Sequence, residues 1–458
     1  MTAAASAEAF LRNPSVYKTS FVAVVIVYYA AWIAFWLWGP PPLVGLLQQI
    51  QNVVPVATLS PAPAYAHFPT PFIDLASIFS WRECFLQGVD VTVSVPCDPM
   101  LRGPANYSPL VWHLPLEWIG FQNILATGMV LDTLFLLLLF SMFQPQTRTE
   151  CLVMILAMVS PAIFFALERC NPDILIFLLI LGAFRLPQNR RWGRIAAYGA
   201  VWIGGLLKFY PFVLLAAALR ERPSRFLVLA AAFLAGISAL ILWNWSYLAH
   251  LVLPKEFVLG MFGARLLGTG LQQDLRLPAS GQTIITVLCC AASFGAMAAL
   301  ARKFAKPVGA LNLFDRNVGA MACGSILVLA CFFSGFNVYY RAIFLLPVIP
   351  GLFDLVRSAE SRSVRKWFGL GLLAAIGCLY ADMFGFTGTK ILQLGILFDP
   401  YSAPGRFAAI TILVLKEAVW WLEVTILGGI LIAALPHAQT VAQSLIFLPW
   451  RRRSATAI

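Results

Sequence analysis

Ionisable side chains at the ends of long apolar runs are the residues of this sequence best suited to chemistry. They fall in four segments: Asp74 to Asp90, Glu168-Arg-Cys-Asn-Pro-Asp173, Lys208-Phe-Tyr-Pro211 and Asn337-Val-Tyr-Tyr-Arg341. Charges beside hydrocarbon are costly, so such residues are expected to serve a function. Cations would hold a phosphate group, and a carboxylate would remove a proton from an attacking hydroxyl. Together they would suit a substrate with a lipid tail, a phosphate and a hydroxylated group.

The composition indicates which elements must position these side chains. Of 458 residues, 60% are hydrophobic and only 11% are charged, whereas about a quarter of residues are charged in soluble domains. This composition predicts a polytopic membrane protein and excludes a disordered chain, a disulfide-rich secreted scaffold and a cytosolic enzyme. The net charge of +12 comes from short basic clusters between apolar runs, a pattern typical of membrane orientation. We therefore expect a lipid bilayer and no nucleic acid as partner.

The apolar runs predict an all-α fold in a single integral membrane domain, 1–458. Twelve segments are expected, at 19–38, 121–143, 150–167, 174–184, 195–206, 209–219, 227–245, 283–301, 318–334, 339–355, 368–384 and 408–435. Because a full crossing needs about 20 residues, the segments 174–184, 195–206 and 209–219 are short. They are better suited to short helical hairpins than to complete crossings.

The basic clusters predict the sidedness of the chain. Arginines both precede and follow 195–219, and a hairpin that enters the membrane and returns places both clusters on one side. Lys208 and Pro211 then fall at its tip, where a charge and a helix break are expected. Most Lys and Arg residues come to lie on the cytoplasmic side with this topology. Both termini are expected there, in a bacterial inner or plasma membrane, with the polar segments on the extracytoplasmic side.

A long first extracytoplasmic loop, 39–120, is expected to contain amphipathic helices. Apolar residues repeat at helical spacing over 43–54 and again over 74–87, which predicts one helix lying in the membrane interface and a second that begins near Asp74. Cys84 and Cys97 share this loop and could form a disulfide if the far side is oxidising. Whether they do is left open by the sequence.

Two further patterns bear on polar residues elsewhere. Lys416 and Glu423 are seven residues apart in the last segment, so they share a helix face and are expected to pair there. The cysteines and histidines show no spacing typical of a metal site. We therefore expect neither a metal site nor a cofactor.

Taken in order, the polar segments resemble the GT-C superfamily of polyprenyl-phosphate-sugar glycosyltransferases. They are most similar to its bacterial family 87 group, which contains polyprenol-phosphate-mannose mannosyltransferases. The resemblance rests on an Asp in the first loop, a Glu-Arg-x-Asn-x-Asp turn, a Lys-x-Tyr-Pro tip and a Tyr-Arg pair before a late helix. In architecture it covers the whole chain, from the long first loop through short hairpins to full-length helices.

The resemblance implies an inverting transfer of a sugar, such as mannose or another hexose or pentose, from a polyprenyl-phosphate donor. The acceptor would be a hydroxyl of an extracytoplasmic glycolipid or glycan. It implies that Asp74 is the general base, that Arg341, Lys208 and Arg169 hold the donor phosphate, and that Tyr210, Tyr340 and Asn337 contact substrate. Asp74 lies farther from the first helix than the family pattern has it. The other acids that could be the base or bind acceptor are Glu83, Glu168 and Asp173, with Asp90 and Asp98.

Other interpretations remain open for the same residues. Asp74 could be a helix cap, the Asn-Pro-Asp173 segment a structural turn, Lys208 an interface lysine and Arg341 an anchor at a helix end. For the whole chain, the alternatives are a transporter or flippase of lipid-linked sugars, a polymerase or ligase of lipid-linked glycans, and a non-catalytic scaffold, which would leave the one-sided cluster of acids and cations unexplained. A transporter would more naturally show internal repeats and polar residues near the centre of the membrane.

Overall fold

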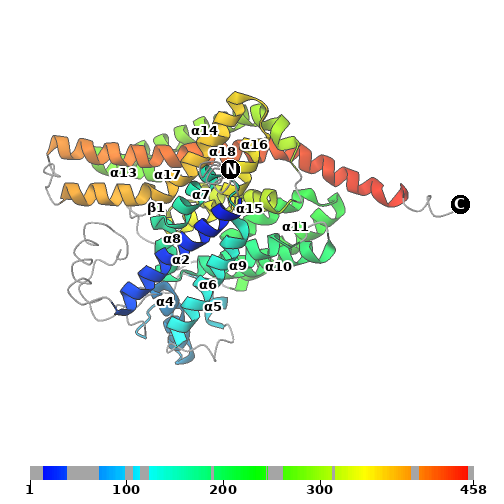
Figure 1. Ribbon diagram of the computed structural model, residues 1–458. Coiled ribbons are helices and arrows are strands. Elements are labelled where there is room, and N and C mark those ends of the chain that lie inside the picture. The colour runs from blue at the N-terminus through cyan, green and yellow to red at the C-terminus, as the bar shows by residue number, and fades with distance from the viewer. Residues whose placement is uncertain are drawn as a thin grey trace, which may run out of the picture.

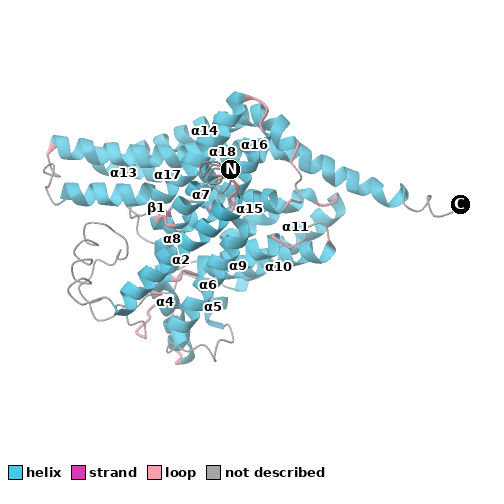
Figure 2. Cartoon of the chain, viewed as in Figure 1, coloured by secondary structure: helices cyan, strands magenta, loops and turns pink. Residues whose placement is uncertain are grey.

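The computed structural model is almost wholly helical (Figure 2). It describes residues 14–38, 72–97, 107–113, 123–186, 190–243, 245, 261–311, 315–393 and 402–451. The elements are α2 (Pro14–Trp38), α4 (Ile73–Leu86), α5 (Leu110–His113), α6 (Ile124–Met142), α7 (Arg148–Met158), α8 (Pro161–Arg169), α9 (Pro172–Phe184), α10 (Arg191–Leu207), the 3₁₀ helix η3 (Tyr210–Arg220), α11 (Pro223–Trp243), β1 (Met261–Phe262), α13 (Leu266–Leu275), α14 (Ala279–Gly309), α15 (Arg316–Ser334), β2 (Asn337–Val338), the 3₁₀ helix η4 (Tyr339–Leu345), α16 (Val348–Ser358), α17 (Arg362–Gln393) and α18 (Ala403–Arg451).

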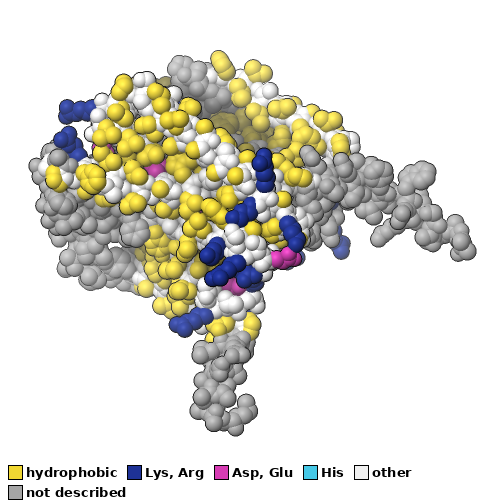
Figure 3. Space-filling view, turned by 90° about the horizontal axis from the view of Figure 1, so that it is seen from above, with side chains coloured by type: hydrophobic (Ala, Val, Ile, Leu, Met, Phe, Trp, Pro, Cys, Tyr) yellow, Lys and Arg dark blue, Asp and Glu magenta, His cyan; other side chains and the backbone are white. Residues whose placement is uncertain are grey.

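The described helices are those of an integral membrane protein. Seven are long and apolar enough to cross a membrane, or up to nine if each of two bent pairs is counted as one span. Two shorter apolar helices, Pro172–Phe184 and Tyr210–Leu219, add to these. Figure 3 shows broad hydrophobic areas on one face, with Lys and Arg side chains gathered in part of it. The all-α polytopic class is confirmed, whereas twelve crossings stay a prediction.

The long helices α14, α17 and α18 pack along one another at one side of the molecule, and α9 to α11 lie at another (Figure 1). Helices α4 and α5 lie at one end. One buried apolar cluster extends from α2 through α9 and α15 to α18, and includes the fully buried Phe135, Phe177 and Trp420. The two strands form a single antiparallel pair in which Phe262 lies opposite Asn337. This pair joins the loop before α13 to the segment that carries Arg341.

The predicted hairpin at 195–219 is present in the structure. Helix α10 ends at Leu207, and η3 begins at Tyr210 and packs back against α10. An ion pair of 3.2 Å between Arg194 and Glu221 joins the two ends of the hairpin. Lys208 and Pro211 therefore lie at its tip, as the charge pattern predicted.

Two apolar runs that look continuous in the sequence are bent in the structure. The run 150–167 becomes α7 and α8, which meet at 43°, and the run 339–355 becomes η4 and α16, which meet at 40°. Pro161 stands at the start of α8 and Pro347 at the start of α16. Because proline has no N–H to donate, a helix restarts there rather than continuing.

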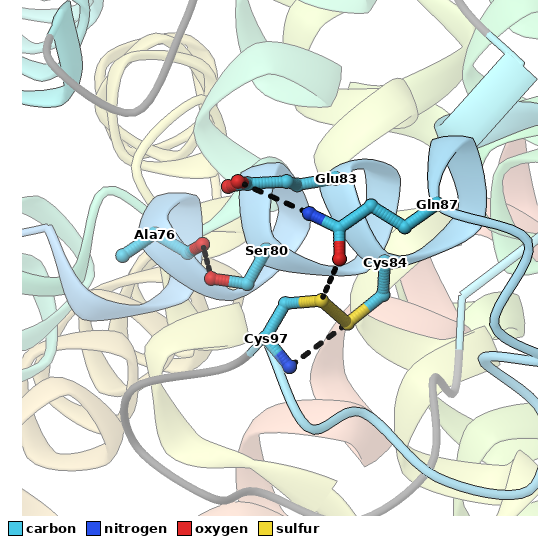
Figure 4. The surroundings of a disulfide bond; sticks show 6 residues. All are labelled: Ala76, Ser80, Glu83, Cys84, Gln87 and Cys97. Atoms are coloured by element: carbon cyan, nitrogen blue, oxygen red, sulfur yellow. Dashed lines mark hydrogen bonds between the residues drawn. A yellow bond between two sulfur atoms is a disulfide. The ribbon is translucent and has the colours of Figure 1, made fainter.

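The first loop contains the expected second helix, α4, which runs from Ile73 to Leu86 rather than Asp74 to Gln87. A disulfide joins Cys84, near its end, to Cys97, across 5.5 Å between Cα atoms (Figure 4). Trp81 and Val95 pack in the small apolar cluster that the disulfide closes. The other expected helix, at 43–54, lies outside the described residues.

Replacing Cys84 and Cys97 by serine is expected to lower the free energy of unfolding by about 3 kcal/mol, as for closed loops of about 15 residues. The effect should be local, because the bridge spans only 13 residues between α4 and the following turn. Thermal unfolding in detergent, with proteolysis of the loop, would measure it. The matched control is the half-buried free pair Cys289 and Cys290. Alkylation of Cys84 and Cys97 in unreduced wild type would contradict the bridge.

The expected pairing of Lys416 with Glu423 is wrong. The Lys416 ammonium lies 3.4 Å from Glu417 and donates to the carbonyl of Met261 at 2.5 Å. Among the described residues, both carboxyl oxygens of Glu423 are buried without a hydrogen-bond partner. The spacing of residues along a helix predicts which of them share a face. It does not predict a partner from a distant part of the chain, such as the Met261 carbonyl of β1 that binds Lys416.

Candidate functional site

A tight turn between α8 and α9 places several polar side chains at one point. Helix α8 ends at Arg169 because Cys170 takes a left-handed conformation, with φ of 43°. Pro172 then starts α9, and the Asn171 side chain accepts a hydrogen bond from the backbone N–H of Asp173 at 3.0 Å. This is an Asx cap followed by proline at the first helical position. The turn therefore has a structural role in starting α9, and it also carries the polar side chains of the site.

The start of α4 is fixed against this turn. The backbone N–H of Phe72 donates to the carbonyl of Glu168 at 2.5 Å, and Phe72 has a φ of 76°, which is uncommon for a residue with a side chain. Its ring fits against α6 because position 128 is glycine, where an added Cβ would lie 2.3 Å from the ring. These contacts hold Asp74, two residues on, beside the turn.

Asp74 is buried and bound by two side chains of the turn. Arg169 donates from Nε to Oδ2 at 2.8 Å and from Nη2 to Oδ1 at 2.6 Å, which is a bidentate pair. Asn171 donates from Nδ2 to Oδ2 at 2.6 Å. A carboxylate held on both oxygens has a fixed orientation. Asp74 lies in the first turn of α4, whose N-cap residue is Phe72, and its side chain binds the turn between α8 and α9 instead of capping its own helix.

Asp173 is the centre of a second cluster and is fully buried. Oδ1 accepts from Lys208 Nζ at 2.8 Å and from the Tyr210 hydroxyl at 2.9 Å, while Oδ2 accepts from Arg341 Nε at 3.2 Å. Arg341 also donates to the side-chain oxygen of Asn337 on β2. All donors of the cluster converge on one carboxylate, so Asp173 holds two cations and a phenol in place.

Asn171 links the two clusters, and it is absent from the site residues that the sequence predicted. Its Nδ2 donates to Asp74, and its Oδ1 accepts from Lys208 Nζ at 3.0 Å. Because one amide satisfies both an acid and an ammonium, its orientation is defined by the network. The position of Asn171 inside the Glu168-to-Asp173 motif could have indicated a role in the site. Only the fold shows that it joins Asp74 and Lys208.

Aromatic side chains form the walls of the network. Lys208 Nζ lies 4.5 Å from the ring centre of Tyr107 and 5.8 Å from that of Tyr340, distances suited to cation–π contact. Tyr340 in turn stacks on Phe165 with centroids 6.0 Å apart. Tyr107 was missed in the sequence, since it lies in the first loop without neighbouring charges. It comes to the site because it packs on Trp81 of α4, at 5.2 Å.

The structure brings together nearly all the site residues predicted from the sequence. Those that meet in or beside the two clusters are Asp74, Glu168, Arg169, Asp173, Lys208, Tyr210, Asn337, Tyr340 and Arg341. Glu168 is buried, and its Oε2 has no hydrogen-bond partner among the described residues. Glu83 is exposed on α4 and accepts a hydrogen bond from Gln87 instead (Figure 4). Asp90 is also exposed and binds Thr92, and Asp98 lies outside the described residues.

The balance of charge makes the network receptive to an anion. Three cations, Arg169, Lys208 and Arg341, form ion pairs with two carboxylates, Asp74 and Asp173. These paired groups carry one excess positive charge, and a third acid, Glu168, lies buried beside them. Arg341 uses two of its five N–H donors in the contacts described, and Lys208 two of its three. The remaining donors could hold phosphate oxygens. Among the described residues, no group of three His, Cys, Asp or Glu could hold a metal ion.

Burial lowers the pKa of Lys208 to about 8, with Asp173 opposing the shift and Arg341 adding to it. The residue lies in the turn between α10 and η3, outside the candidate spans. The ammonium is therefore charged below about pH 8 and loses its charge as pH rises through that value. A lysine at this point would bind an anion best at neutral pH.

The affinity of this site for an anionic ligand is accordingly expected to fall as pH rises through about 8, and binding titrations at a series of pH values would measure it. The matched control is Lys208→Arg, because a guanidinium keeps its charge over this range. The affinity of this variant should stay constant between pH 7 and 10, even where it is lower than that of wild type. An identical decline in both proteins would show that Lys208 does not cause it.

Comparison with known protein families, curated proteins and solved structures finds no match to this chain.

Proposed function

We propose that this chain is an inverting glycosyltransferase that moves a sugar from a polyprenyl phosphate to an acceptor hydroxyl at the extracytoplasmic surface. The observation that carries the proposal is the junction of two clusters: an oriented carboxylate, Asp74, beside a group of cations in positive excess. Transfer from a lipid phosphate needs these two functions, a base and a site for the phosphate. The spanning helices would keep both at the level of the lipid substrate.

In this proposal Asp74 accepts the proton of the acceptor hydroxyl. The hydroxyl oxygen bonds to the anomeric carbon from the face opposite the phosphate, and the bond from that carbon to the phosphate oxygen breaks. Polyprenyl phosphate leaves with the bonding electrons, so the configuration inverts. Arg169 and Asn171 hold Asp74 in one orientation, so that the carboxylate is already positioned when the acceptor binds. We assign Arg169 to this positioning rather than to the phosphate, because its Nε and Nη2 already bind the acid.

Arg341 and Lys208 are proposed to hold the leaving phosphate. Asp173 holds both cations in place through its ion pairs. Their remaining N–H donors would then be preorganised to bind the phosphate oxygens on which negative charge develops. Tyr107 and Tyr340 flank Lys208 and would bind the sugar ring or the first part of the lipid. Asp173 itself is not proposed as the base, because it is fully buried and forms ion pairs with two cations, Lys208 and Arg341. Two cations favour its ionised form and make it a poorer proton acceptor, whereas the ion pair of Asp74 is with Arg169.

Arg341→Ala is expected to lower kcat/KM for the donor by about 10- to 100-fold, because hydrogen bonds to charged groups are worth about 1.5–3 kcal/mol. Lys208→Ala should have an effect of similar size. Initial rates with a polyprenyl-phosphate sugar in lipid nanodiscs would measure both. The control is Arg265→Ala, which removes an exposed cation outside the clusters. Unchanged donor kinetics in both variants would refute the phosphate site.

A further inference from the structure

A cavity lined by both charged and apolar side chains lies at the opposite end of α10 from Lys208. It has a volume of about 360 Å³ and lies between the first turn of α10 and the first turn of α11. The α10 residues that line it, from Arg191 to Tyr198, are 10 to 17 residues from Lys208, so at 1.5 Å per residue the cavity is about 15–25 Å from Lys208. It shares no residue with the candidate site described above.

The cavity carries excess positive charge around one buried acid. Glu221, 5% exposed, accepts a hydrogen bond from the Tyr198 hydroxyl at 3.2 Å and pairs with Arg194 at 3.2 Å. Arg225 approaches the same carboxylate at 3.7 Å and is half-exposed. Arg191 also lines the cavity, and it has no ion pair within the described chain. Three guanidinium groups thus face one carboxylate, which leaves two positive charges in excess.

Apolar side chains border the same cavity. Ile195 on α10 is 60% exposed and Val228 on α11 is 69% exposed, and both line it. Helix α11 is one of the candidate spans, and Arg225 lies in its first turn. The cavity therefore lies where a span leaves the hydrocarbon, with cations at the surface and aliphatic groups directly below.

We propose that this cavity binds the phosphate group of an anionic membrane phospholipid, with an acyl chain lying along Ile195 and Val228. Planar guanidinium groups suit bidentate contact with phosphate oxygens, and basic pockets between spanning helices are suited to anionic headgroups. The buried Glu221 orients Arg194 and Arg225 without cancelling the charge of the cavity. The exposed aliphatic border favours a phosphate attached to hydrocarbon over a free phosphate ion.

The test titrates the full-length protein in detergent with phosphatidylglycerol, with phosphatidylcholine of the same chains, and with inorganic phosphate, and counts bound molecules by native mass spectrometry. Wild type should bind phosphatidylglycerol at least tenfold more tightly than phosphatidylcholine. In the variant Arg191→Gln/Arg225→Gln this preference should fall at least fivefold. The control Arg302→Gln/Arg362→Gln removes two exposed cations elsewhere and should keep it.

Equal binding of the two lipids by wild type would overturn the proposal, as would an equal loss in the control. Binding of inorganic phosphate that displaces phosphatidylglycerol at equal concentration would also overturn it, because the acyl chain would then contribute nothing. Arg194 is left intact, since its pair with Glu221 joins the ends of the hairpin. If the double variant unfolds, Arg191→Gln alone serves, because that side chain is exposed and has no ion pair in the described chain. The single variant should still lose at least half of the preference.

Discussion

Asp74→Asn is expected to lower the rate of sugar transfer at least about a hundredfold while the protein still folds. Proton removal by a positioned carboxylate contributes about 10²–10⁴-fold to a rate, and an amide cannot accept the proton. Asn keeps the size of the side chain and one oxygen for Arg169, which now donates to Asp74 at 2.6 and 2.8 Å. The measurement is kcat in nanodiscs at saturating donor, with thermal unfolding as the check on folding.

Two variants make this result specific to Asp74. Asp90→Asn removes an exposed acid of the same loop, which binds only Thr92, and should leave the rate within twofold of wild type. Glu168→Gln tests the other buried acid beside the site. If Asp74→Asn keeps more than a tenth of the wild-type rate while Glu168→Gln abolishes transfer, the base is Glu168 and our assignment is wrong.

Asp173→Ala is expected to cause the largest loss of stability of any single substitution at the site, about 3–5 kcal/mol. Removing one partner of a buried ion pair leaves the other charge without compensation. Here the loss would leave two cations, Lys208 and Arg341, and the Tyr210 hydroxyl without their common acceptor. Unfolding in mixed detergent micelles would measure the change in free energy.

A second variant separates lost charge from lost packing. Asp173→Asn/Lys208→Met removes one charge of each sign and should recover part of the stability lost in Asp173→Asn. The surface control is Asp315→Ala, which removes an exposed N-cap of α15 and should cost only about 1 kcal/mol. If Asp173→Ala unfolds no more easily than Asp315→Ala, the cluster does not hold the site together.

The meeting of four distant segments could be predicted from the sequence because each is placed at the end of an apolar run. The ends of membrane-spanning helices lie near the two membrane surfaces, and successive ends alternate between the two sides. Polar residues at helix ends on the same side are therefore brought to the same membrane surface. Asp74, Asp173, Lys208 and Arg341 follow this rule. The hairpin turn at Lys208 could be predicted from the charge pattern. A single helix crossing the membrane over 195–219 would have placed the arginine clusters before and after it on opposite sides of the membrane.

The pairing within the site could not be predicted in this way. Sequence pattern places a residue on a helix face or at a helix end, but partners are chosen by differences of a few ångströms in packing. The pair that Arg169 forms with Asp74 was not predicted, nor was the position of Asn171 between the two clusters. Tyr107 reaches Lys208 only because α4 packs on the turn after α8. In α18, Lys416 pairs with Glu417 rather than Glu423 for the same reason.

The most direct test of the central proposal is a donor panel with purified protein in lipid nanodiscs. Polyprenyl-phosphate sugars of different sugar identity are supplied one at a time, with a membrane glycolipid extract as acceptor. Free polyprenyl phosphate and the new glycoside are then measured, including the anomeric configuration of the product. Our account predicts that one donor is consumed, that polyprenyl phosphate is released in equal amount, and that the new bond has inverted configuration. Saturable binding of these lipids without release of polyprenyl phosphate from any donor would contradict it and favour a flippase.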